Sequence, residues 1–117
     1  MSIRTETLAD HTLVTPEGRI DYNSAAALQA ELERAIAATR APAPVIVDCG
    51  ALEYVSSAGL RSFLVAARAA QKAGIAFALC ALQPAVREVF NLSGFSQIMA
   101  IHADRETARA RMLAGQP

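Results

Sequence analysis

The chain has 117 residues, 53% of them hydrophobic, and its eleven basic residues balance eleven acidic ones. This length suits one domain spanning residues 1–117, and the apolar content is enough for a core without disulfides or metals. Zero net charge gives no sign of a surface for nucleic acid or an anionic membrane, so a partner must recognise the protein by shape and local chemistry.

We expect neither a secretory leader nor a membrane helix in this sequence. The first six residues are mixed polar, and no segment reaches the ~18 uncharged apolar residues that a membrane helix needs. We therefore expect a cytoplasmic protein. In that reducing compartment Cys49 and Cys80, which lie inside apolar runs, should be small buried side chains. His11 and His102 are far apart in the sequence, and no metal site is predicted.

The N-terminal part indicates a hairpin followed by a helix. Residues 3–8 and 11–15 are strand-like segments around a turn, and Pro16-Glu17-Gly18 should end the second strand. Residues 24–40 have the apolar spacing of one helical face, after an Asn23-Ser24 capping pair. The positions expected on one face of this helix are Leu28, Leu32, Ala35, Ile36 and Thr39.

The rest of the chain alternates strands and helices. Residues 45–47 are a β-branched run typical of a strand covered on both faces. A loop over 48–55 should lead to a helix that starts at Ser56 or Ser57 and ends before Gly74. Further elements are expected as strands at 75–82 and 97–101, a helix that begins at Pro84 and is ended by Gly94, a last helix capped by Asp104, and a frayed tail at 113–117.

This order predicts an α/β fold. Strands that alternate with helices favour right-handed crossovers and a parallel sheet, to which the N-terminal hairpin adds an antiparallel pair. We expect a mixed sheet of about five strands with about four helices.

The two serines at the start of the second helix are the candidate functional residues. Functional groups in open α/β sheets collect beyond the carboxyl ends of the strands. A helix start offers unpaired N–H groups and partial positive charge, so a phosphate on a serine there would be tolerated. A serine in this place is more often only an N-cap. The two roles are compatible if one serine caps and the other is exposed, and the sequence leaves open which.

Three segments resemble the STAS domain, and more narrowly the bacterial anti-sigma factor antagonists. The family signature is similar to Tyr54-Val55-Ser56-Ser57-Ala58-Gly59-Leu60-Arg61. Glu17-Gly18-Arg19-Ile20-Asp21 resembles its Gly-x-Leu-Asp segment, and Leu92-Ser93-Gly94-Phe95 resembles its Leu-x-Gly-Phe turn. The segments occur in the family's order, and the resemblance implies a STAS-like fold over nearly the whole chain.

The resemblance also implies a function as a partner switch. The unmodified protein would bind an anti-sigma factor that is also a serine kinase, and phosphorylation of Ser57 would release it. A metal-dependent serine phosphatase would reset the switch. The protein itself would be no enzyme, would hold no cofactor, and would be a monomer or weak dimer. Ser56 stands where the family usually has Asp, which makes it a second candidate acceptor.

The predicted partner-binding residues are Asp21, Ser56, Ser57, Ala58, Gly59 and Arg61. By ordinary expectation Asp21 is a turn or capping residue and Arg61 is a solvated side chain; the family resemblance adds the partner contact. Leu92 and Phe95 are expected to serve core and turn packing.

Two alternatives belong to other classes. A STAS module can be a subunit of a transporter or lipid-trafficking complex without a phosphorylation cycle, although such modules often lack the acceptor serine that this chain has. A serine hydrolase is disfavoured because its strained turn needs Gly-x-Ser-x-Gly, and Val55 occupies the first glycine position.

Overall fold

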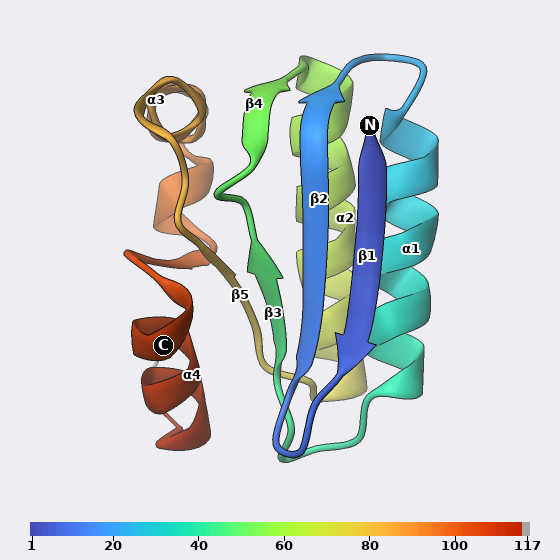
Figure 1. The fold of residues 1–117 in the computed structure, drawn as a ribbon, viewed down its shortest axis with the longest axis vertical. Coiled ribbons are helices and arrows are strands. Elements are labelled where there is room, and N and C mark those ends of the chain that lie inside the picture. Colours follow the sequence, from blue (N-terminus) through green and yellow to red (C-terminus); the bar gives the residue numbers. More distant parts are fainter. Residues whose placement is uncertain (116–117) are drawn as a thin grey trace.

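The structure is a computed structural model that describes residues 1–115 (Figure 1). The described residues form six strands, four α-helices and one short 3₁₀ helix. In chain order these are β1 (Ser2–Thr7), β2 (Thr12–Ile20), α1 (Ala25–Ala38), β3 (Val45–Asp48), β4 (Leu52–Val55), α2 (Ser57–Ala73), β5 (Phe77–Cys80), α3 (Pro84–Ser93), η1 (Phe95–Gln97), β6 (Ala100–His102) and α4 (Arg105–Leu113).

The strands form one mixed sheet in the order β1-β2-β3-β5-β6, with β4 paired to β2. Strand β1 is antiparallel to β2, and every other pair is parallel. Helices α1 and α2 lie together behind the sheet in Figure 1, whereas α4 packs beside β3, β5 and β6 on the other face. The predicted mixed α/β architecture is confirmed.

Strand β2 is longer than predicted, and this error has a clear cause. Pro16 was expected to end the strand, but it lies inside β2. Strand β3 pairs with Thr12–Val14 and β4 pairs with Gly18–Ile20. Pro16 therefore sits between two parallel partners, where its missing N–H removes no rung of either ladder. The expected loop 48–55 is likewise wrong in part, because its second half is β4.

The core lies mainly between the sheet and the helix pair α1 and α2. Of the five positions predicted on one face of the first helix, the four apolar ones are buried there, whereas Thr39 is the half-buried C-cap residue after the end of α1. On α2 and α3, Phe63 and Phe90 meet with ring centroids 5.7 Å apart. Burial of both cysteines is confirmed, with Cys49 in the main core and Cys80 in a small cluster beside α4. Burial raises the pKa of the Cys80 thiol to about 12, which makes it an inert apolar side chain.

The C-terminal part of the chain differs from the prediction at three places. Leu92 is 81% exposed, so its predicted core role is wrong. Val86 and Phe90 form the buried side of α3, and Leu92, two residues after Phe90, points away from it. The strand predicted at 97–101 is η1 followed by the shorter β6. Leu113 is the last residue of α4, and residues 116–117 of the expected tail lie outside the described residues.

No helix in the described part of the chain has the length and apolar character to cross a membrane.

Candidate functional site

Two parallel strands end side by side at one end of the sheet, and both lead into helices. Ile20 of β2 pairs with Val55 of β4, and the Ser56 N–H donates to the Ile20 carbonyl at 2.8 Å. The next residues, Asp21 on one segment and Ser56 on the other, therefore begin two adjacent loops (top of Figure 1). The β2–β4 pairing thus places Asp21 beside the serine pair.

The structure assigns different positions to the two serines. Ser56 has extended backbone geometry and is the N-cap of α2, where its hydroxyl accepts a hydrogen bond from the Gly59 N–H at 3.1 Å. Its carbonyl accepts from the Leu60 N–H at 2.9 Å. Ser57 is the first residue of the helix and is exposed, whereas Ser56 is half-buried. One serine therefore caps and the next faces solvent.

Asp21 shapes the turn that leads into α1. Its carboxylate accepts hydrogen bonds from the Ser24 N–H at 2.9 Å and the Ser24 hydroxyl at 3.0 Å, and its carbonyl accepts from the Ala25 N–H. The Ser24 N–H, followed by the Ser24 hydroxyl, holds the pKa of Asp21 below its usual value. Asp21 is thus an exposed, ionised residue that fixes its own loop next to the serine pair.

The start of α2 is held by close packing. A Cβ on Gly59 would lie 2.7 Å from Cγ2 of Ile20 and 2.9 Å from Cγ1 of Val55, so only glycine lets the helix approach the two strand ends. The Ser62 hydroxyl donates to the Ala25 carbonyl at 2.8 Å and ties α2 to α1. Gly59 is buried, which removes it from the predicted partner surface; its role is to position the serines.

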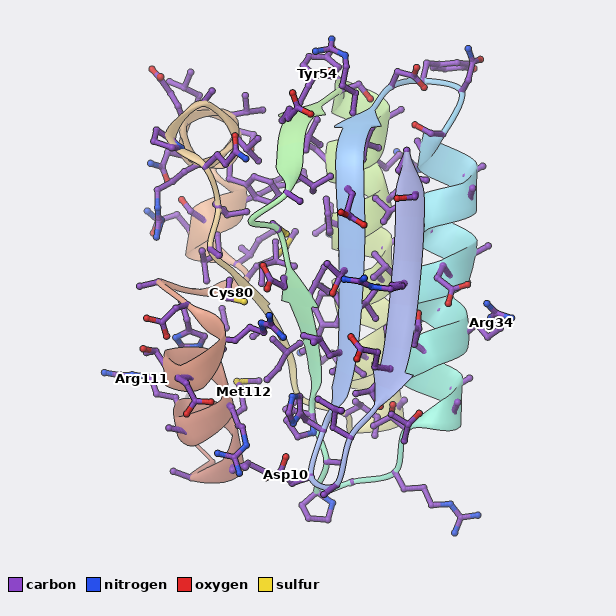
Figure 2. The ribbon with its side chains drawn as sticks, in the orientation of Figure 1. Asp10, Arg34, Tyr54, Cys80, Arg111 and Met112 are labelled. Carbon is purple, nitrogen blue, oxygen red and sulfur yellow. The ribbon has the colours of Figure 1, made fainter. Side chains whose placement is uncertain are left out.

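The remaining predicted residues lie at the surface. Ala58 is half-buried and packs against the core, and Arg61 is exposed one turn after Ser57. Sequence reasoning missed the contact between Arg19 and Tyr54. The guanidinium carbon of Arg19 lies 4.3 Å from the centroid of the Tyr54 ring. They meet because β2 and β4 pair in register. Figure 2 shows Tyr54 at the same end of the molecule as the helix start. The only sequence signal was the position of both residues within family-like segments.

His11 lies away from the two serines. His11 precedes the start of β2, whereas Ser57 follows the end of β4, and the two strands are parallel. The histidine thus lies at the opposite end of the sheet, too far to act as a general base for Ser57. No group of side chains suited to hold a metal ion occurs among residues 1–115.

Comparison with known proteins identifies the family. The STAS domain model matches residues 2–108. The chain belongs to the STAS family. It is also 41% identical over 95 residues to a protein of Bordetella bronchiseptica that carries the name anti-sigma factor antagonist BtrV, with 81% of this chain and 82% of that protein covered. The chain therefore belongs with the anti-sigma factor antagonists among STAS proteins.

Solved STAS structures share the fold at low sequence identity. An anti-sigma factor antagonist from Mycobacterium paratuberculosis has a TM-score of 0.82 at 22% identity, with 93% of each chain covered. The Bacillus cell fate determinant SpoIIAA, in its phosphorylated form, has a TM-score of 0.69 at 22% identity, with 94% of this chain and 98% of that chain covered. These likenesses extend the STAS fold over nearly all of the chain.

Proposed function

We propose that this STAS protein is a partner switch controlled by phosphorylation of Ser57. In its unmodified form it binds an anti-sigma factor that is also a serine kinase, and phosphorylation releases it. The observation that carries the proposal is the different environment of the two serines. The hydroxyl of Ser56 accepts the capping hydrogen bond of α2, whereas Ser57 is exposed on the first turn of that helix.

The position of Ser57 supports a switch that acts on binding and leaves the fold intact. A phosphate at the start of α2 faces unpaired N–H groups and the positive end of the helix dipole, so the protein accommodates it. The phosphate adds about −1.5 to −2 charges to an exposed surface. A partner packed there meets a desolvated charge that costs several kcal/mol, and each 1.4 kcal/mol lowers affinity about tenfold.

In this proposal the protein is a substrate and has no enzyme activity of its own. The kinase uses ATP and Mg²⁺ to phosphorylate Ser57, and a metal-dependent serine phosphatase removes the phosphate in the bacterial cytoplasm. Asp21, Ala58 and Arg61 are the proposed partner-contact residues beside the two serines. Ser56 is the second candidate acceptor, but its half-buried hydroxyl is the less accessible of the two.

The test has two steps. The unmodified protein is first used to capture its kinase, and the captured kinase is then used to phosphorylate wild type and the serine variants. Wild type and Ser56→Ala should each take up one phosphate, as measured by intact mass, and Ser57→Ala should take up none. Full phosphorylation of Ser57→Ala would refute the assignment.

A binding experiment tests the release step. Ser57→Asp should bind the kinase at least tenfold more weakly than wild type in calorimetry, because it places a charge on the contact surface. Equal affinity would contradict the electrostatic mechanism. A protein that captures a transporter subunit and no kinase would instead support a STAS module without a phosphorylation cycle.

A further inference from the structure

Helix α2 carries a local charge asymmetry inside a chain of zero net charge. Its sequence contains Arg61, Arg68 and Lys72 and no acidic residue. All three cations are exposed. Within the described residues, the ion pairs involve other basic side chains and none of these three. Their charge is therefore available to a partner.

The three cations lie on the same stripe of the helix as Ser57. At 3.6 residues per turn, positions 57, 61, 68 and 72 fall within an arc of about 60°. Leu64 lies at the margin of this arc. The buried residues of α2 face the sheet and α1 instead. We call Arg61, Arg68 and Lys72 the α2 stripe; it begins one turn below the proposed phosphorylation site and runs to the end of the helix.

A groove lined by both apolar and polar residues follows one margin of the α2 stripe. A hollow of about 200 Å³ is lined by Leu64, Ala67, Arg68, Gln71 and Ile98. A second hollow of about 300 Å³ continues it toward Phe77 and Met99 and shares Ala67, Gln71 and Ile98. Ile98 is 59% exposed, so an apolar side chain of a partner would bury surface that now faces water.

We propose that the α2 stripe and this groove form a docking surface for a protein segment that presents apolar side chains flanked by carboxylates. The alternation of cations with apolar positions matches an amphipathic acidic helix, whose apolar face enters the groove while its carboxylates meet Arg61, Arg68 and Lys72. Three cations on a neutral chain are too few for a nucleic-acid track. A membrane-binding helix would need a much more apolar face than Leu64 and Ile98 provide.

The inference rests on the proposed function in one respect, because it takes the anti-sigma factor as the partner. It also supplies a reason for release. A phosphate on Ser57 stands four residues before Arg61, where side chains on a helix meet. The phosphate engages that arginine and repels the carboxylates that the α2 stripe attracts.

Charge reversal at Arg68 or Lys72, at the end of the α2 stripe far from Ser57, tests the docking surface without changing the phosphorylation site. Arg68→Glu and Lys72→Glu should each weaken binding of unphosphorylated protein to the kinase at least tenfold, and more strongly at low salt. Arg40→Glu, which reverses an exposed cation outside α2, is the matched control and should bind within about twofold of wild type. Wild-type affinity in both α2 variants would overturn the inference even if Ser57 is phosphorylated normally.

If wild-type protein binds no kinase, the proposed function is refuted but the docking surface is not. A second experiment then tests the docking surface directly. Isotope-labelled protein is titrated with an amphipathic helical peptide of leucine and glutamate, and amide shifts are followed by NMR. Shifts confined to α2 and the segment around Ile98, absent with a leucine–lysine peptide, support the surface. No shifts would overturn it. Equal or larger shifts with single-stranded DNA or phosphatidylglycerol vesicles would also overturn it, because they would identify a different class of partner.

Discussion

Replacement of Ser56 by alanine should destabilise the protein, although the same change at Ser57 should not. The Ser56 hydroxyl is the acceptor for the Gly59 N–H. Loss of an N-cap costs about 0.5–2 kcal/mol. Gly59 is buried, so water cannot replace the lost acceptor, and the cost should be about 1.5 kcal/mol. With an unfolding entropy of about 2.1 cal/mol/K per residue over 117 residues, the expected fall in Tm is about 6 °C.

The assay is thermal unfolding followed by far-UV circular dichroism, with urea unfolding as a second measure of the free energy. Ser57→Ala removes an exposed hydroxyl and should stay within about 0.5 kcal/mol of wild type. Ser56→Asp restores an acceptor and adds a favourable charge at the helix start, so its Tm should match or exceed that of wild type. Equal losses for the two alanine variants, or no loss at Ser56, would show that the cap is not formed as described.

Two further predictions concern packing and charge away from the serines. Gly59→Ala should reduce the free energy of unfolding by about 1–3 kcal/mol in urea titration, because its Cβ would lie 2.7 Å from a methyl group of Ile20; an unchanged value would contradict the close approach. Hydrogen bonds from Arg109 and then His11 lower the pKa of Asp10 from 3.8 to about 2. Their contribution to stability should be complete above pH 4 and lost as the pH falls toward 2, because the unfolded chain then binds more protons. Carboxyl NMR titration should find the Asp10 pKa near 2 in wild type and higher in Arg109→Ala, where the hydrogen bond with His11 remains; equal values would contradict the pairing.

Several features followed from local sequence alone. The buried side of α1, the capping role of a serine before α2 and the glycine ends of α2 and α3 all depend on residues within a few positions of one another. Asp104 was likewise predicted to cap the last helix, and it accepts a hydrogen bond from the Thr107 N–H at 2.8 Å. Short-range periodicity and capping are encoded where they act, so a sequence shows them without its partners.

Other features needed the folded sheet. The passage of β2 through Pro16 and the neighbourhood of Asp21 and Ser56 depend on β2 pairing with two different strands. The contact of Arg19 with Tyr54 depends on the same register. Which serine caps and which is exposed was decided by where β4 ends and α2 begins. These relations join residues 30 or more positions apart, and only long-range pairing and packing bring such residues together.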